Sequence, residues 1–212
     1  RYRLPDSATV THLLDLSPDR LRERLAERGL PGYRAAQIRK WIFEKRAATF
    51  DAMTDLGKPL RDALAAEFVI FSGSIAAHRT AEDGTEKLLI AWPDGHRIEC
   101  VLIREGKRRT ICISTQVGCA MGCVFCASGL DGVARNLTTG EILEQMLQLQ
   151  RLLPADERLS NIVVMGMGEP LANYGPTVAT LRRLRDDVGL SARHLTVSTV
   201  GMVPAIRRLA AE

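Results

Sequence analysis

From residue 110 onward, apolar segments of strand length alternate with segments of helix length, and this alternation constrains the fold more than any other feature of the chain. Strands are expected at residues 111–115, 161–165 and 194–199, and helices at 138–153, 177–187 and from 204. The second strand is a nearly continuous apolar run, which is typical of a strand buried on both faces of a parallel sheet. This order predicts an α/β fold with a parallel sheet or barrel. Three βα units are too few for a closed barrel, so we expect a partial (β/α) barrel to which more chain was once attached.

Two other patterns precede the alternating region. Residues 1–68 are predicted to be helical, with helices beginning at Ser17-Pro18 and Gly32-Tyr33 and a third helix around residues 60–68. Residues 69–109 contain short strands separated by Asp83-Gly84 and Asp94-Gly95, dipeptides that favour hairpin turns. The sequence therefore predicts a helical accessory domain at 1–68, a β-hairpin extension at 69–109 and the N-terminal part of a barrel at 110–212.

Composition and charge exclude several classes of protein. With 46% hydrophobic and 25% charged residues, the chain has the composition of a globular protein. No run reaches the ~18 apolar residues of a membrane helix, and residues 1–5 lack the apolar core of a signal peptide. We therefore expect a cytoplasmic protein with no membrane partner. The net charge of +4 permits RNA as a partner, although the ordinary interpretation of the arginine-rich helices of residues 1–68 is a solvated outer face.

Cys119, Cys123 and Cys126 form a C-x3-C-x2-C array in a glycine-rich loop directly after an expected strand. Three thiolates in one loop fit an iron–sulfur cluster that leaves one iron open for a small molecule. A structural zinc ion requires four ligands, and Cys112 could supply the fourth, so a zinc site stays open as an alternative. Three buried structural thiols would not explain so regular a spacing.

A second landmark follows the next expected strand. Gly168-Glu169-Pro170 comes directly after the apolar run, and the third strand ends in small polar residues that include Ser198. Ligands of α/β folds gather at the carboxyl ends of strands, which fits all of these positions. Glycine allows close backbone approach, and the carboxylate of Glu169 can pair an ammonium group. The tripeptide alone is most often a turn, so its place one βα unit after the cysteine loop gives it weight.

Together, these residues resemble the signature of radical S-adenosylmethionine (SAM) enzymes, including the aromatic Phe125 before the last cysteine. Over residues 112–123, 135–142 and 163–171 the chain is similar to the dual-specificity RNA adenine methyltransferases, and the likeness extends over essentially the whole chain. The resemblance implies a partial radical-SAM barrel behind a helical, RNA-contacting domain. It also implies an enzyme that methylates C2 of an adenine in 23S ribosomal RNA and in tRNA. A close relative modifies C8, which stays open as an alternative.

The resemblance further implies a reaction with two SAM molecules, because a ring carbon such as C2 is not a nucleophile. One SAM methylates a cysteine near the enzyme's C-terminus, and a [4Fe-4S] cluster cleaves the other to a 5′-deoxyadenosyl radical that abstracts hydrogen from the methylthio group. The carbon radical adds to adenine, and a second cysteine resolves the protein–RNA crosslink by forming a disulfide. The methyl-carrying cysteine would lie beyond Glu212, so we expect this chain alone not to complete methyl transfer.

Individual roles follow from the resemblance. The cluster ligands would be Cys119, Cys123 and Cys126, and the SAM contacts Gly168, Glu169 and Ser198. Cys112 matches the resolving cysteine, although the ordinary interpretation of an isolated cysteine is a small packing residue. Glu99 matches the proton acceptor near the adenine, although a glutamate beside hairpin turns is usually just solvated. Cys100 matches no role and is interpreted as packing.

The implied partners are 23S rRNA, tRNA and a reducing electron donor of the flavodoxin type, and the implied state is a monomer. RNA would be attracted by the helical domain and by the run Lys107-Arg108-Arg109. Two other classes of protein also fit the sequence. One is a zinc-binding RNA-interaction module without catalysis, and the other is a catalytically inactive structural fragment.

Overall fold

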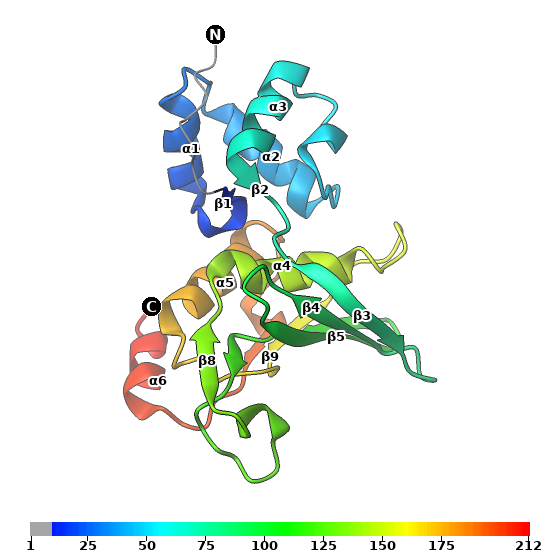
Figure 1. Cartoon of the computed structure of the whole chain (residues 1–212), viewed down its shortest axis with the longest axis vertical. Coiled ribbons are helices and arrows are strands. Elements are labelled where there is room, and N and C mark those ends of the chain that lie inside the picture. The colour runs from blue at the N-terminus through cyan, green and yellow to red at the C-terminus, as the bar shows by residue number, and fades with distance from the viewer. Residues whose placement is uncertain (1–9) are drawn as a thin grey trace. The chain divides into compact units, whose positions relative to one another are not determined.

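A computed structural model describes residues 10–212 of the chain (Figure 1). The chain divides into two compact units, one ending at Ser72 and the other extending from Gly73 to Glu212. Residues 1–5, on which the expectation of no signal peptide depends, lie outside the described part. Among the helices of residues 10–212, none combines the length and the apolar character needed to cross a membrane.

The first unit contains the three helices that the sequence predicts. They are α1 (Pro18–Ala26), α2 (Tyr33–Phe43) and α3 (Lys58–Glu67), with one 3-10 turn before α1 at Leu13–Asp15 and another between α2 and α3 at Phe50–Ala52. Ser17 caps α1 by accepting a hydrogen bond from the backbone N–H of Arg20 at 3.2 Å. A short parallel pair, β1 (Thr11–His12) and β2 (Phe68–Val69), joins the two ends of the unit. Fully buried side chains from all three helices, such as Leu25, Ile38 and Leu64, form its core.

The arginines of α1 are engaged within the first unit. Glu67 is buried, and its carboxylate accepts from Arg24 at 2.8 Å and also pairs with Arg28. Arg20 pairs with Glu23 one helical turn away. These contacts favour the solvated, internally paired face over a row of cations reserved for phosphate.

The second unit is built on one six-stranded sheet with the order β10-β9-β6-β5-β4-β3. The strands are β3 (Ser74–Thr80), β4 (Glu86–Ala91), β5 (Arg97–Glu105), β6 (Arg108–Cys112), β9 (Asn161–Val164) and β10 (Leu195–Val197). Strands β6, β9 and β10 are parallel, as predicted, whereas β3 to β6 are antiparallel. The hairpin strands of residues 74–105 therefore belong to the same sheet as the barrel strands (Figure 1).

Helices cover one face of this sheet. Helix α4 (Thr139–Gln150) contacts β5, α5 (Tyr174–Asp186) lies against β10, and α6 (Val203–Ala210) follows β10. The residues that β5, β6 and β9 direct to this face are fully buried: Ile98, Cys100, Leu102, Ile111 and Ile162. Side chains alternate between the two faces along each strand, so the residues next to these five in the sequence point to the opposite face of the sheet.

Several local features differ from the sequence-based expectation, among them the start of α5 at Tyr174 rather than residue 177 and the shorter β10, Leu195–Val197 rather than 194–199. The first barrel strand is expected at 111–115, but β6 begins at Arg108 and takes in part of the basic run. Helix α4 ends at Gln150 rather than Leu153. A small antiparallel pair, β7 (Gln116–Gly118) and β8 (Val133–Asn136), is not predicted, because three or four residues give too short a pattern to recognise.

The predicted capping box of α4 is present and can be tested by mutation. Thr138 Oγ1 accepts from Glu141 N–H at 3.2 Å, and Glu141 Oε2 accepts from Thr138 N–H at 2.9 Å. Thr138→Ala should lower the free energy of unfolding by about 1 kcal/mol, measured as a lower urea midpoint with an unchanged slope. Thr139→Ala, one position further on, is the control and should change it by less than about 0.5 kcal/mol. Equal midpoints for the two variants would contradict this role.

Candidate active site

The loops that follow β6 and β9 are held side by side by backbone hydrogen bonds. Ile113 N–H donates to Val163 O at 3.0 Å, Gly166 N–H to Ile113 O at 3.0 Å, and Thr115 N–H to Met167 O at 2.8 Å. The parallel pairing of the two strands therefore continues past their ends. It brings the segment that leads into the cysteine loop against the segment that carries Gly168 and Glu169.

Two glycines make this close approach sterically feasible. A Cβ on Gly166 would lie 2.5 Å from Ser114 Oγ, and a Cβ on Gly168 would lie 2.6 Å from Gln116 Cβ. Gly168 also has φ = +97°, which disfavours any residue with a side chain. Gly168 is expected from the resemblance to contact the cofactor, and the structure adds a packing requirement within the chain itself.

Glu169 connects the loop after β9 to the loop after β10. Its side chain is buried. Oε1 accepts hydrogen bonds from Thr199 Oγ1 at 2.8 Å and from Leu171 N–H at 2.9 Å. Oε2 accepts a hydrogen bond from Val200 N–H at 2.9 Å. A carboxylate offers about four acceptor positions, so these three bonds leave room for about one further donor. Exposed Ser198, whose N–H donates to Val164 O at 3.2 Å, lies beside Thr199. The structure thus brings Gly168, Glu169 and Ser198 together, while their contact with SAM stays a prediction.

Glu99 and Cys112 lie on the face of the sheet opposite to Cys100. Cys112 pairs directly with Val101 of β5, and directly paired residues point to the same face. Glu99 is two residues from Val101 on the same strand and therefore shares that face. The Glu99 side chain is 47% exposed and forms an ion pair with Lys87 at 2.9 Å. The register alone therefore places the expected proton acceptor and the expected resolving cysteine on one surface.

Ser114 links Glu99 to the loop after β9. Its hydroxyl donates to Glu99 O at 2.6 Å and accepts from Met167 N–H at 2.8 Å, and Glu99 N–H contacts Met167 Sδ at 3.4 Å. Gln145 of α4 holds the backbone of Ser114 on both sides, at 2.8 Å and 2.9 Å. These roles of Ser114 and Gln145 are not predicted from the sequence, because the partners are far apart along the chain and Ser and Gln carry no distinctive signal.

The two cysteines of β5 and β6 have raised pKa values for the same physical reason. Partial burial raises the pKa of the Cys112 thiol, and a hydrogen bond with the backbone of Met165 opposes this shift. Deep burial, with Cys112 and the carboxylates of Glu99 and Glu144 nearby, raises the pKa of Cys100 far above its usual range. Cys100 therefore lies in the core as an inert thiol.

The three array cysteines lie between β7 and β8. At the base of their loop, Cys119 N–H donates to Gly132 O at 2.9 Å, and a Cβ on Gly118 would lie 2.1 Å from that same oxygen. All five cysteines are free of disulfides. Within residues 10–212, the side chains of His, Cys, Asp and Glu form no group of three or more that could hold a metal ion. The structure thus places these cysteines on one loop without gathering their sulfurs.

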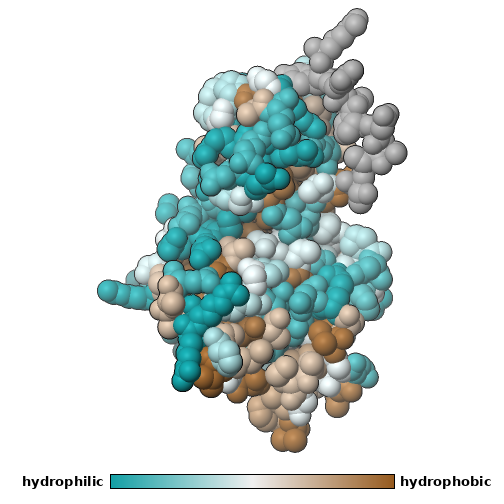
Figure 2. Space-filling view, turned by 90° about the vertical axis from the view of Figure 1, so that its left-hand side faces the viewer, coloured by the Kyte–Doolittle hydropathy of each residue, from teal (hydrophilic) through white to brown (hydrophobic). Residues whose placement is uncertain are grey.

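The chemistry of the donor set nevertheless fits an iron–sulfur cluster. Hydrogen bonds from the hydroxyl and backbone of Ser128 lower the pKa of exposed Cys126, which favours the thiolate that binds iron. Val124 and Phe125 between the cysteines are almost fully exposed, and Figure 2 shows hydrophobic residues at this lower end of the second unit. Cys112, the candidate fourth zinc ligand, is instead held within the sheet.

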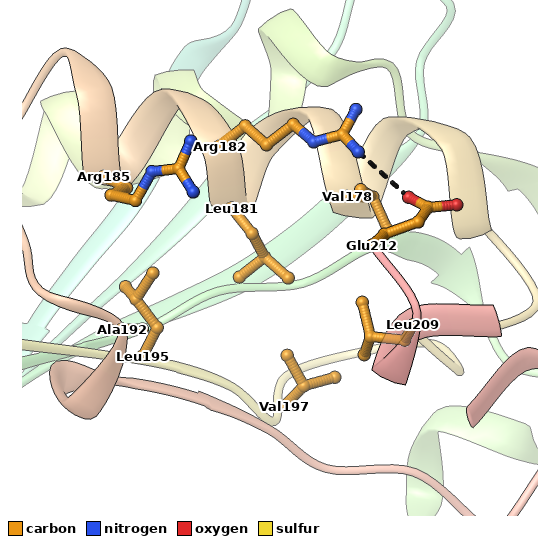
Figure 3. A pocket seen from close by; sticks show the side chains of 9 residues that line it. All are labelled: Val178, Leu181, Arg182, Arg185, Ala192, Leu195, Val197, Leu209 and Glu212. Atoms are coloured by element: carbon orange, nitrogen blue, oxygen red, sulfur yellow. Dashed lines mark hydrogen bonds and ion pairs between the residues drawn. The ribbon is translucent and has the colours of Figure 1, made fainter. Parts of the chain in front are cut away.

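A separate apolar hollow of about 230 Å³ lies on the helix-covered side of the sheet. Figure 3 shows Val178 and Leu181 of α5 facing Leu195 and Val197 of β10, with Arg182 at the rim. Leu195 and Val197 pair with Ile162 and Val164, which point away from the face of Cys112 and Glu99. This hollow is therefore not part of the candidate site.

Comparisons with known proteins match both parts of the chain. Residues 11–70 match the family model of the ribosomal RNA large subunit methyltransferase N-terminal domain, and residues 113–212 match the model of the radical SAM superfamily. The chain is 58% identical, over 94% of its length, to a protein of Rhodopirellula baltica named "Probable dual-specificity RNA methyltransferase RlmN". A protein of the same name from Bacillus subtilis is 44% identical over 91% of the chain.

The chain spans about half the length of these relatives, 54% in both cases. Among solved structures, it is similar to a radical SAM methyltransferase from Sphaerobacter thermophilus, with a TM-score of 0.91 and 45% identity. That match covers 95% of this chain and 60% of the other. The partial radical-SAM fold expected from the sequence is thereby confirmed.

Alkylation of the metal-free chain with iodoacetamide should distinguish the cysteines. Because the pKa of Cys126 is lowered and that of Cys112 is raised, Cys126 should react at lower pH, and Cys100 should not react in the folded state. Ser128→Ala should move the pH profile of Cys126 upward and leave that of Cys112 in place. Site-resolved mass spectrometry across a pH series measures both profiles, and an unchanged Cys126 profile in the variant would contradict the assigned cause.

Proposed function

We propose that the chain is part of an RNA methyltransferase, because residues 113–212 match the radical SAM superfamily model and residues 11–70 match the model of the ribosomal RNA large subunit methyltransferase N-terminal domain. Its substrate would be an adenine of 23S rRNA, methylated at C2, and also an adenine of tRNA. The relatives' shared name supports RNA methylation of dual specificity. The observation that carries the proposal is the convergence of the cysteine-loop base, Gly168-Glu169 and Ser198 at the carboxyl ends of three parallel strands.

In this proposal, Cys119, Cys123 and Cys126 hold a [4Fe-4S] cluster, and Gly168, Glu169 and Ser198 contact SAM. The bound cluster supplies the electron for reductive cleavage of SAM, the radical chemistry that an unactivated ring carbon requires. The remaining acceptor position of Glu169 would take the SAM ammonium group. A reducing donor of the flavodoxin type, a monomeric state and a cytoplasmic setting complete the proposal.

Glu99 and Cys112 would act from the face of the sheet that the helices do not cover. The exposed Glu99 carboxylate would accept the proton from the adenine, and Lys87 holds it in place through the ion pair. Cys112 would release the product by forming a disulfide with the methyl-carrying cysteine that the resemblance implies, while the bond between that cysteine's sulfur and the transferred carbon breaks. The Cys112 thiol would lose its proton in this step, and the remaining electron would return to the cluster. The placement of both residues on one surface supports this division of roles.

Anaerobic reconstitution with iron and sulfide tests the cofactor assignment. The chain should become brown, and reduction should give an EPR signal that changes when SAM is added. Cys119→Ala should lose the iron, whereas Cys100→Ala should keep it, because Cys100 lies in the core away from the loop. A colourless chain that retains zinc would overturn the proposal in favour of a zinc-binding RNA module.

The three residues of the basic run that is expected to attract RNA, Lys107-Arg108-Arg109, have different surroundings in the structure. Arg109 is held by Glu157, at 2.5 Å and 2.9 Å, and donates to Gly106 O at 2.8 Å. Lys107 and Arg108 are exposed at the turn between β5 and β6. Lys107 and Arg108 are therefore the better phosphate contacts, and Arg109 stabilises the fold.

RNA binding at several salt concentrations tests this division. The double variant Lys107→Ala with Arg108→Ala should bind an unfolded 23S rRNA fragment more weakly, with the log–log salt slope reduced by about 1.4 for two lost contacts to single strands. Arg109→Ala should lower the melting temperature and leave the slope nearly unchanged. A double variant with the wild-type slope would exclude these residues from the RNA interface.

A further inference from the structure

Gln116 is a buried amide at the start of β7, two residues before the glycine that opens the cysteine loop. The proposed function gives it no role. Its position is unusual because the backbone on one side leads directly into Cys119, while its side chain faces the loop after β9. It therefore contacts both segments on which the proposed cofactor site depends.

Both the oxygen and the nitrogen of the Gln116 side-chain amide form hydrogen bonds. Oε1 accepts from Glu169 N–H at 2.8 Å, and Nε2 donates to Asn136 Oδ1 at 2.7 Å. The backbone N–H of Gln116 also contacts Met167 O at 3.3 Å. Asn136 belongs to β8, the strand that closes the cysteine loop on its other side. One side chain thus joins β7, β8 and the backbone of Glu169.

Packing leaves these groups little freedom to move separately. A Cβ on Gly168 would lie 2.6 Å from Gln116 Cβ, 2.8 Å from its Cγ and 2.8 Å from its backbone nitrogen. The Gly168 backbone therefore rests directly on Gln116. A shift of the Gly168-Glu169 segment relative to the cysteine loop would break the Glu169 N–H bond or create a clash.

We propose that Gln116 is a positioning residue that sets the register between the cysteine loop and the Gly168-Glu169 loop. It acts through other residues: through β7 and β8 it holds the base of the loop of Cys119, and through Glu169 N–H it holds the segment assigned to SAM. The inference rests on the proposed function for its chemistry, but the mechanical coupling of the two loops depends only on the contacts above.

Gln116→Met tests the proposal, because methionine has a similar size but supplies neither hydrogen bond. The reconstituted variant should keep its iron content and its EPR signal without SAM. Its Kd for SAM, measured by equilibrium dialysis, should rise about tenfold, because Glu169 N–H loses its buried acceptor. Hydrogen exchange should become faster in residues 119–126 and in residues 166–171 together.

Gln150→Met is the matched control. Gln150 is also a buried glutamine, at the end of α4, but its Oε1 has no hydrogen-bond partner among residues 10–212. The same substitution there should leave the Kd for SAM and the exchange of both loops unchanged. Asn136→Ala is the milder test, since it removes one support of the Gln116 amide at an exposed position, and it should raise the Kd by about threefold.

The outcomes separate this inference from the proposed function. Wild-type chain that binds neither cluster nor SAM would overturn the proposed function, whereas the exchange measurement needs no cofactor and still judges the coupling of the loops. Unchanged exchange together with an unchanged Kd in Gln116→Met would overturn the positioning role. The positioning role would also be overturned if Gln116→Met lost iron only to the extent that less of the protein is folded. A residue that merely stabilises the fold gives that result.

Discussion

The parallel backbone pairing that continues beyond β6 and β9 is the constraint on which the rest of the candidate site depends. Ordinary strands separate where their loops begin, but here the hydrogen bonds from Gly166 to Ile113 and from Thr115 to Met167 extend the ladder. Side chains that would normally keep two loops apart are absent at Gly166 and Gly168. The site is therefore built first from backbone, and polar side chains such as Gln116 then fix its details.

The two faces of the sheet divide the work between stability and chemistry. The face under α4 and α5 buries apolar residues and takes Cys100 into the core, where its thiol is inert. The other face carries Glu99, which is exposed and paired with Lys87, and the partly buried Cys112. Glu99 and Cys100 are adjacent on β5 and therefore point to opposite faces of the sheet, one to the candidate site and the other to the core.

Sequence reasoning succeeded where the determining contacts are local. The capping box at Thr138 and the turn at Asp83-Gly84 depend on residues within a few positions, and the structure contains both. It failed where partners are remote: the acceptor of the Glu169 N–H is 53 residues away on Gln116, and Glu157 is 48 residues from Arg109. A run of three basic residues gives no indication that its last member faces an acid from another loop.

The missing Cβ atoms at Gly166 and Gly168 also change how a mutational library of this protein should be interpreted. Any side chain there would collide with the chain's own atoms before it could disturb a ligand. A screen that selects only for folded protein would therefore retain glycine at both positions, even when no cofactor is present. Intolerance to substitution at these two sites reports on the architecture, so ligand contact has to be established by binding measurements.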